Sequence, residues 1–492
     1  MLAAGCAINP VSGRPEVTLV SETKEREIGE TEARRVAESM GLVDDPALIA
    51  YVRAVGERLA RFSPRAGVPY RFAIVEMEEP NAFALPGGYV YVSRGLLVLT
   101  NSEDELAGVV AHEIGHVAAR HAVRRVTRAA PLAVLTGLTA MVTGIVSPTL
   151  GSVVGGIGGA AGALILAPYS RDQEREADRV GQDIVAKAGW DPAGLSRMLR
   201  TLEREEAMHG GTRRAMGFFA THPPLPRRVA ETEEHARELE RGVAQPIAGS
   251  RRDFLRKLEG LVVGPRAAEG VFDGETFLHP DLDFHVRFPA GWKTANEHTV
   301  VGAQAPDGRA VVVLETAGEG SDPEAALRAL EKESKVSLAS SSERRTVNGL
   351  PAVHATARGR TRDGHLALDL TWIAHADNIY RLTGATPPSG AEAMRSVFRA
   401  TADSFGPLTA AERAAIRELR LDVVDARAGE TLATLLARTD SAWSPEFAAV
   451  ANGLEPAAML RGGEPVKVAV SRPYAPRRRS PAASVGGTPQ AR

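Results

Sequence analysis

The pattern of apolar and polar positions predicts a helical N-terminal half. Apolar residues recur three or four positions apart in several stretches, which is the spacing of one buried helix face. The predicted helices cover residues 21–62 with a break near 41–46, residues 101–127, a stretch that begins at 170, residues 192–208 and residues 226–242. Runs of β-formers at Tyr70–Val75 and Gly88–Val92 predict two strands. These elements predict a mainly helical domain with a small sheet over residues 21–245.

Two of these helices begin with a cap signal. Ser102 precedes Glu105 by three positions, and Ser170 precedes Gln173 by three, which is the spacing of a capping box. The stretch between the two helices, Ala129–Ser170, contains no charged residue, and its second half is rich in glycine. Because glycine weakens a helix by about 1 kcal/mol per residue, we expect a flexible apolar hairpin here. It would cover the site or touch the bilayer surface rather than span the membrane.

The composition changes after residue 245, where a linker is expected over residues 246–275. Short β-runs and two helical stretches follow, and they predict a separate α+β domain over residues 276–406. The β-runs are 284–288, 310–315, 352–357, 366–374 and 379–383, and the helices are 323–338 and 391–405. A small unit is expected over residues 407–472 and a disordered tail over 473–492.

Charge and cysteine content limit the possible partners and the interactions that can stabilise the fold. The formal net charge is −2, so there is no overall positive field to recruit nucleic acid, and we expect no nucleic-acid partner. Cys6 is the only cysteine, so no intrachain disulfide can form, and the fold must depend on core packing and on metal.

The strongest chemical signal is the run His112-Glu113-Ile114-Gly115-His116 in the predicted helix 101–127. Residues i and i+4 share one helix face, so both imidazoles can bind the same ion. Glu113 lies beside them, where it can take a proton from the attacking water. This pattern predicts a hydrolase with one Zn²⁺ per chain, with His112 and His116 as ligands and Glu113 as the general base.

Catalytic zinc usually has three protein ligands, so a third is needed. The positions three and six residues after His116 hold alanine, which excludes the metzincin arrangement. His121 is near but falls on the wrong helix face for the same ion, and we interpret it as a polar residue close to the helix end.

Glu174 and Asp178 are better placed, because they are again i and i+4 on a second predicted helix. We expect Glu174 to be the third ligand. Asp178 is expected to accept a hydrogen bond from the outer ring N–H of a ligand histidine. Between them, Arg175 and Glu176 are interpreted as an ordinary charged helix face.

These motifs together resemble the M48 family of zinc metallopeptidases, which are gluzincins with a zincin-type fold. The segment from Asn81 to Gly88 resembles the edge strand of the family's active site. That resemblance implies that an extended substrate pairs with the backbone of this strand at residues Asn81, Ala82, Phe83 and Ala84. The resemblance covers residues 6–245.

A downstream motif agrees with the same family. Thr221-His222-Pro223, with Arg228 six residues after the histidine, resembles a family motif. In relatives the equivalent histidine occupies the fourth zinc position or stabilises the transition state. The resemblance therefore implies either an inhibitory or a catalytic role for His222.

The C-terminal half shows weaker resemblances. The stretch from His279 to Phe284 and the strands after it resemble a PsbP/Mog1-like α+β domain, and residues 407–472 resemble a LysM-like module. LysM modules bind glycan, so the module is a candidate for binding peptidoglycan. Binding of a protein partner and simple packing remain equally open. These two C-terminal units differ from the tetratricopeptide repeats that similar M48 proteins of the BepA type carry. The binding partner of this half is therefore left open.

The N-terminus resembles the lipobox of bacterial lipoproteins. Leu2-Ala3-Ala4-Gly5-Cys6 fits the cleavage pattern, although no basic or apolar leader precedes it. The resemblance implies a lipid on Cys6, a tether over residues 1–20, and a periplasmic protein anchored to the outer membrane.

The whole pattern resembles the periplasmic BepA-type lipoproteins of family M48. It implies a self-restrained zinc endopeptidase that cleaves unfolded or misassembled envelope proteins. The alternative is an envelope assembly or chaperone-like factor whose zinc site is latent. The intact Glu113 favours the enzyme, because a pure scaffold does not need this base.

Overall fold

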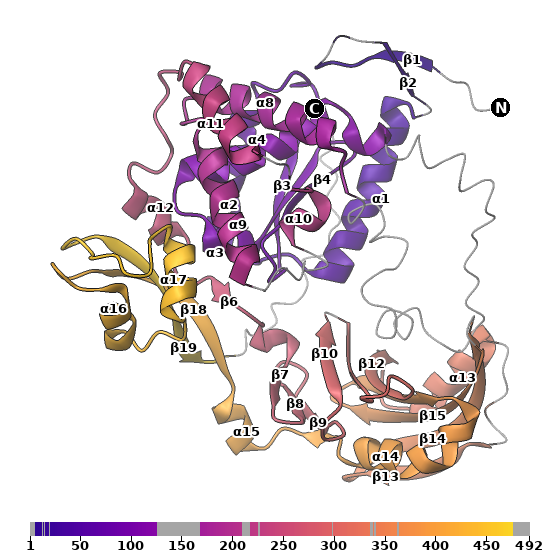
Figure 1. The fold of residues 1–492 in the computed structure, drawn as a ribbon. Coiled ribbons are helices and arrows are strands. Elements are labelled where there is room, and N and C mark those ends of the chain that lie inside the picture. The colour runs from indigo at the N-terminus through magenta and orange to yellow at the C-terminus, as the bar shows by residue number, and fades with distance from the viewer. Residues whose placement is uncertain are drawn as a thin grey trace, which may run out of the picture. The chain divides into compact units, whose positions relative to one another are not determined.

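A computed structural model describes residues 5–11, 13, 15–18, 20–124, 168–208, 217–224, 227–297, 299–334, 338, 341–361 and 364–475. These residues form two compact units (Figure 1). The first unit combines the described residues up to Pro265 with Leu419–Ser471, and the second covers Arg266–Glu418. Most of the predicted hairpin 129–170, and the tail from residue 476, lie outside the described residues.

Helices dominate the first unit, as predicted. The helices are α1 (Glu22–Met40), α2 (Pro46–Ala60), α3 (Arg94–Leu99), α4 (Glu103–Ala118), α8 (Arg171–Lys187), α9 (Gly194–Met208), α10 (Phe218–Thr221), α11 (Arg228–Glu238) and α12 (Arg251–Lys257). The capping box at Ser170 and Gln173 is confirmed in full. At α4, Ser102 caps the helix, but the Glu105 carboxylate accepts from the backbone N–H of Asn101 rather than from that of Ser102.

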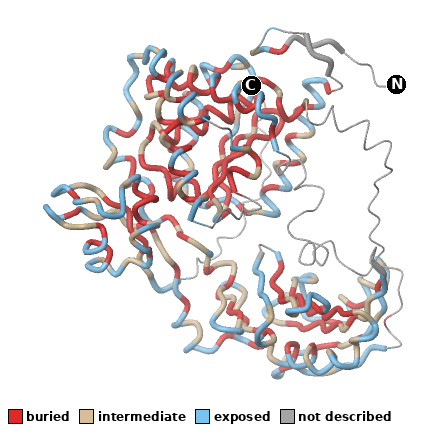
Figure 2. The backbone as a smooth tube through the Cα atoms, viewed as in Figure 1, coloured by how far each residue is buried: buried red, intermediate tan, exposed pale blue. Residues whose placement is uncertain are grey.

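A three-stranded sheet supports α4 in this unit. It has the order β3 (Arg71–Val75), β5 (Tyr89–Ser93), β4 (Ala82–Leu85), with β3 parallel and β4 antiparallel to β5. The strand predicted to face the substrate, β4, is therefore an edge strand. Helix α4 packs against β4, β5, α2, α8 and α9, and every residue of α4 except Asp104 is buried (Figure 2). A helix enclosed in this way holds its polar side chains in a low-dielectric interior.

Helices α4 and α8 approach each other through glycines. A Cβ atom at Gly115 would lie 2.9 Å from the carbonyl O of Ala177. A Cβ atom at Gly181 would lie 2.8 Å from the backbone N of His112. Both distances are too short for real side chains, so only glycine allows the two backbones to pack this closely.

The end of α4 differs from the prediction of one helix over 101–127. The helix ends at Ala118, and Arg120 adopts a left-handed conformation with φ of 54°. Its guanidinium donates to Glu25 Oε2 and to the carbonyl O of Val20, both at 2.9 Å, which stabilises this conformation. A helical turn then resumes at His121.

Much of the predicted linker (246–275) and of the small unit predicted over 407–472 packs into the core of the first unit. Within residues 246–275, α12 buries Phe254 and Leu255, and β6 (Val262–Val263) pairs with β18 (Arg417–Asp425). Strand β18, α16 (Leu432–Arg438), α17 (Pro445–Asn452) and β19 (Pro465–Pro473) share the core of the first unit. The reason is long-range packing that local sequence does not reveal.

Lys467 on β19 illustrates this packing. Its side chain is fully buried, and Nζ donates to the carbonyl O atoms of Val98 at 2.7 Å and Thr100 at 2.8 Å. Val98 lies in the last turn of α3 and Thr100 caps that helix, three residues before α4 begins. The C-terminal strands are thus fastened to the segment that leads into the HExxH helix.

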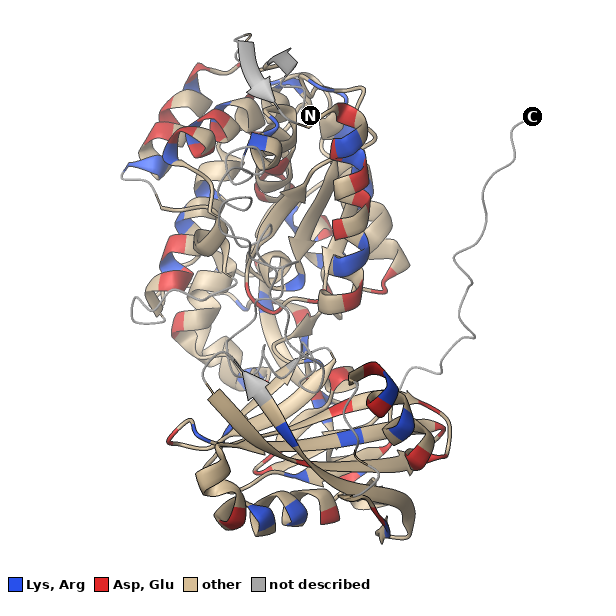
Figure 3. Cartoon of the chain, turned by 90° about the vertical axis from the view of Figure 1, so that its right-hand side faces the viewer, with Lys and Arg blue, Asp and Glu red and all other residues tan. Residues whose placement is uncertain are grey.

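Within the predicted tether (residues 1–20), β1 (Gly5–Ile8) and β2 (Pro15–Thr18) form an antiparallel hairpin. Within the described ranges, no helix is both long and apolar enough to cross a membrane. Positive and negative residues are interspersed along the helices of both units (Figure 3).

The second unit is an α+β domain, as predicted. An antiparallel seven-stranded sheet has the order β10 (Lys293–Glu297), β11 (Val300–Gln304), β12 (Val311–Glu319), β16 (Asn378–Thr386), β15 (Gly364–His375), β14 (Leu350–Thr361), β13 (Glu343–Val347). A four-stranded sheet has the order β17 (Gly406–Pro407), β9 (Phe284–Arg287), β8 (Thr276–His279), β7 (Val271–Asp273). Helices α13 (Pro323–Ser334) and α14 (Ala391–Asp403) pack on the larger sheet.

The close approach of α4 and α8 gives the first prediction. An alanine in a helix interior usually stabilises a protein by about 0.5–1 kcal/mol relative to glycine. We expect Gly181→Ala to do the opposite and lower the free energy of unfolding by about 1–3 kcal/mol, because its Cβ overlaps the backbone of His112. Urea unfolding measures this change. Gly67→Ala is the control, because nothing lies within 4 Å of its added Cβ. A stabilised Gly181→Ala variant would contradict the backbone contact.

Candidate metal centre

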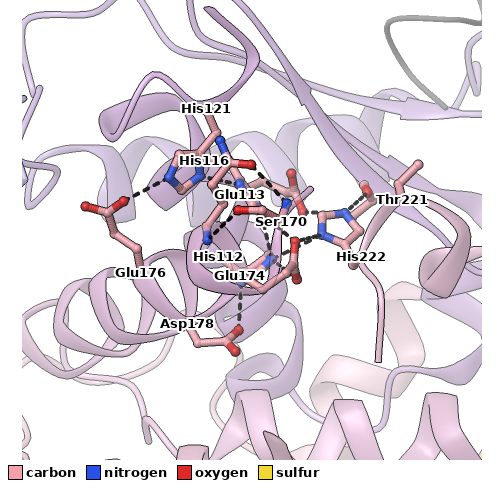
Figure 4. Close-up of polar contacts among 12 residues, drawn as sticks. His112, Glu113, His116, His121, Ser170, Glu174, Glu176, Asp178, Thr221 and His222 are labelled. Atoms are coloured by element: carbon pink, nitrogen blue, oxygen red, sulfur yellow. Dashed lines mark hydrogen bonds and ion pairs between the residues drawn. The ribbon is translucent and has the colours of Figure 1, made fainter. Parts of the chain in front are cut away.

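Helix α4 presents His112, Glu113 and His116 to one buried point (Figure 4). The three side chains are at most 1% exposed. The Nε2 atoms of His112 and His116 lie 3.0 Å apart, so the predicted i, i+4 pair does converge. Two buried imidazole nitrogens at this distance are suited to share one cation.

Glu174 on α8 joins them, as the sequence predicted. Its Oε1 lies 3.4 Å from His116 Nε2, and its Oε2 lies 3.6 Å from His112 Nε2. The carboxylate is fully buried. The glycine contacts between α4 and α8 are what bring this side chain within reach.

His222 follows directly after the short helix α10 and completes the group. Its Nδ1 lies 3.3 Å from His112 Nε2 and 3.1 Å from Glu174 Oε1. The ring stacks on Phe218, with centroids 4.4 Å apart, and is fully buried. From sequence spacing alone it would be only a loop histidine, and the family motif was the signal that identified it.

The spacing of these atoms fits a tetrahedral metal ion. Ligand atoms about 2.0–2.1 Å from a tetrahedral Zn²⁺ are about 3.4 Å from one another. Four of the contacts among His112 Nε2, His116 Nε2, Glu174 Oε1 and His222 Nδ1 measure 3.0–3.4 Å. Three imidazoles and a carboxylate are also a donor set that Zn²⁺ prefers.

Glu113 also lies close to the three histidines, since one of its oxygens and one ring nitrogen each of His112, His116 and His222 all fall within 4.8 Å of one another. Both of its carboxylate oxygens are buried, and among the described residues neither accepts a hydrogen bond. The nearest ring nitrogen is His222 Nε2, 3.4 Å from Oε1. Burial raises the pKa of Glu113, with opposing contributions from the neighbouring histidines. Such a carboxylate binds and releases a proton more readily near neutral pH than an exposed glutamate does.

Asp178 and Arg228 hold the ligands in place. Asp178 Oδ1 lies 2.9 Å from His112 Nδ1, so the two side chains that the sequence paired do lie in contact. Arg228 at the start of α11 donates to both Asp178 oxygens, at 2.7 and 2.8 Å, and its Nη1 lies 2.9 Å from Glu174 Oε2. The motif was recognised in the sequence, but this role of Arg228 was not.

The charges of this cluster compensate one another. Burial alone would raise the pKa of Glu174, but His222 and Arg228 outweigh it and hold that pKa well below its usual range. Burial lowers the pKa of His116 well below its usual range. At neutral pH, Glu174 is therefore a carboxylate and His116 is a neutral imidazole, which are the states that bind a metal ion.

His121 and Glu176 were interpreted as ordinary polar residues, and the structure corrects this. Because Arg120 turns the chain, His121 is fully buried, and its Nδ1 lies 2.7 Å from His116 Nδ1. Its Nε2 lies 3.0 Å from Glu176 Oε2. An unbroken helix would have directed this ring away from His116. No local signal in the sequence predicts the left-handed residue.

The edge strand β4 passes directly beside the cluster. The carbonyl O of Ala82 lies 3.1 Å from His222 Nε2, and Thr221 Oγ1 lies 3.4 Å from Asn81 Oδ1. Phe83 stacks on Tyr91 in the core, with ring centroids 4.9 Å apart. Of the four predicted substrate-binding residues, Asn81 and Ala82 therefore contact the His222 segment.

The part of the chain that contains this site is similar to known peptidases. The model of peptidase family M48 matches residues 46–236. The beta-barrel assembly-enhancing protease of Escherichia coli K12 is 30% identical over 239 residues, which is 48% of each chain. Metalloprotease YcaL of the same organism is 32% identical over 188 residues, covering 37% of this chain and 69% of the relative. The mitochondrial metalloendopeptidase OMA1 of Schizosaccharomyces pombe is 29% identical over 230 residues, covering 46% and 65%.

Two solved structures show weak similarity to part of the chain. The cyanobacterial PsbP of Synechocystis is 12% identical with a TM-score of 0.23, covering 28% of this chain and 95% of that one. The Saccharomyces cerevisiae Ran-binding protein Mog1p is 10% identical with a TM-score of 0.21, covering 29% and 99%.

The ligand geometry gives the second prediction. We expect Glu174→Ala to weaken zinc binding by more than the roughly 10- to 100-fold that loss of a ligand's hydrogen-bond partner costs, because a ligand itself is removed. Zinc competition with a chelator measures this change. Asp172→Ala, on the same helix with its side chain exposed, is the control. An unchanged affinity in Glu174→Ala would exclude it as a ligand.

Proposed function

Because this chain belongs to peptidase family M48, we propose that it is a zinc-dependent endopeptidase of the bacterial cell envelope. The observation that carries the proposal is the convergence of His112, His116, Glu174 and His222, with the unbonded carboxylate of Glu113 beside them. The proposed substrates are unfolded or misassembled envelope proteins. The chain spans 48% of the length of the E. coli beta-barrel assembly-enhancing protease, so its own substrates need a direct test.

The residues suit hydrolysis of a peptide bond. When bound, Zn²⁺ would polarise the scissile carbonyl and lower the pKa of a water molecule. Glu113, buried with a raised pKa, accepts the proton of the attacking water and returns it to the leaving amine. Asp178 and Arg228 orient His112 and Glu174, so the ligand side chains need little reorganisation during the reaction.

Strand β4 supplies a place for an extended substrate. Its other edge pairs with β5, so the free edge can add a substrate strand through backbone hydrogen bonds. Unfolded chains can adopt this extended form, whereas folded proteins cannot offer it without opening. This geometry favours unfolded or misassembled substrates.

In this arrangement His222 would restrain the proposed peptidase activity. Its Nδ1 takes part in the four-atom cluster, and its Nε2 lies at the carbonyl O of Ala82 on the free edge of β4. In this position one side chain occupies the fourth ligand position and also a backbone acceptor that a substrate would use. Activation would therefore require the His222 segment to move.

The envelope location rests on the relatives and on the N-terminus. The E. coli relative is named for β-barrel assembly, and the segment ending in Cys6 resembles a lipobox. We propose a lipid anchor at Cys6 in the outer membrane, facing the periplasm. The strand–helix–helix–strand order of β18, α16, α17 and β19 supports a LysM-like module as a candidate peptidoglycan contact.

A second candidate function is an assembly or chaperone-like factor whose zinc site is latent. The position of His222 in the ligand cluster favours it, because a four-ligand site has no open position. The two functions differ in whether Glu113 is used.

The third prediction separates them. We expect Glu113→Gln to keep zinc and stability but to lose cleavage of casein by about 10²–10⁴-fold, because only the general base is removed. Zinc content, thermal unfolding and casein cleavage check it. Full activity in Glu113→Gln would contradict the mechanism, and absence of cleavage in both proteins would favour the assembly factor.

The fourth prediction concerns self-restraint. We expect His222→Ala to raise cleavage of an unfolded substrate several-fold, because one competing ligand leaves and the acceptor on Ala82 becomes free. His235→Ala is the control, since this partly exposed histidine pairs with Asp183 outside the site. A loss of cleavage in His222→Ala would instead assign the residue to stabilisation of the transition state.

A further inference from the structure

A chain of three side chains leads outward from the ligand His116. His116 Nδ1 lies 2.7 Å from His121 Nδ1, and His121 Nε2 lies 3.0 Å from Glu176 Oε2. The first two rings are buried, and the Glu176 side chain is 23% exposed. We propose that His121 and Glu176 are positioning residues, which orient His116 through this hydrogen-bonded chain and strengthen it as a zinc ligand.

The donors and acceptors of this chain fit one arrangement. If His116 Nε2 binds the metal, its proton must reside on Nδ1, where it can be donated to His121 Nδ1. His121 must then carry its own proton on Nε2, and that proton is donated to the Glu176 carboxylate. Each nitrogen thus has one role, and the carboxylate at the end selects the tautomer of both rings.

The two ligand histidines of α4 are supported in different ways. His112 Nδ1 contacts Asp178 directly at 2.9 Å, which is the common arrangement of carboxylate, histidine and metal. His116 has no carboxylate at its Nδ1, and His121 bridges the gap to Glu176. The imidazole of His121 lies between His116 and Glu176. Each of the two ligand histidines is therefore supported by a carboxylate of α8, His112 directly and His116 through His121.

The backbone is shaped to make this contact. Arg120 has a left-handed conformation, held by Glu25 and the carbonyl O of Val20, and this turn brings His121 back to His116. Tyr169 stacks on the ring of His116, with centroids 3.7 Å apart and planes inclined by 17°. The ring of His116 is thus fixed at its face by Tyr169 and at Nδ1 by His121.

The Glu176 carboxylate, at the outer end of this hydrogen-bonded series, has two partners. The hydrogen bond from His121 lowers the pKa of Glu176, and Arg124 Nη1 lies 3.5 Å from the same oxygen. The Glu176 oxygen that accepts from His121 is therefore also held from a second side by Arg124.

The inference rests on the proposed zinc site, and zinc affinity tests it without any measurement of activity. We expect His121→Phe, which fills the volume but accepts no hydrogen bond, to weaken zinc binding by roughly 10- to 100-fold. His121→Asn can keep an acceptor near the position of Nδ1 but loses the donor to Glu176, so we expect a loss of affinity smaller than that of His121→Phe. Glu176→Gln still accepts from His121 but lacks the charge, and we expect an intermediate loss.

The affinities are measured by competition with a chelator, and thermal unfolding of the metal-free proteins is recorded beside them. Asp172→Asn removes one negative charge from the same helix at an exposed position and is the matched control for Glu176→Gln. If the hydrogen-bonded side chains act on the metal, the variants differ from the wild type in zinc affinity. The melting temperatures of the metal-free proteins then stay similar.

Two results would overturn the inference. One is a His121→Phe variant with wild-type zinc affinity. The other is equal affinity loss in His121→Phe and His121→Asn that follows a loss of stability in the metal-free proteins, since this marks a purely structural role. If the wild-type protein itself binds no zinc, the proposed function fails, and that outcome is distinct from both.

Discussion

The backbone contact between α4 and α8 is the constraint on which the rest of the site depends. Gly115 and Gly181 allow the two helices to pack without intervening side chains. Only at this separation can Glu174 on one helix reach the histidines of the other. The supporting contacts of Asp178 and Glu176 come from the same helix pair, so two glycines set the geometry of the candidate ligands and of the side chains that support them.

The close contact concentrates charge in a dry interior, which must be compensated. Glu113, Glu174 and Asp178 are all buried, and Arg228 is the buried cation that contacts two of them. Leaving one partner of such a group unpaired costs several kcal/mol. A divalent ion among the ligands would add positive charge where carboxylates dominate, so metal binding and electrostatic balance favour the same arrangement.

The sequence predicted the parts of the site that depend on local spacing. His112 and His116, like Glu174 and Asp178, are i and i+4 on helices, and this spacing fixes a shared face. His121 could not be placed, because its position depends on the left-handed turn at Arg120, which distant Glu25 stabilises. For the same reason, the packing of residues 419–471 was missed: it depends on contacts such as Lys467 with Val98, which are remote in sequence.

The route of the chain through the first unit has a consequence for synthesis. The second unit is inserted between β6 and β18, and the strands that close the core of the first unit come from Leu419–Ser471. A ribosome therefore releases the HExxH helix long before it releases the residues that complete the core around it. The nascent peptidase domain must wait for residues 419–471, so the core around the HExxH helix cannot close until the whole second unit has been made.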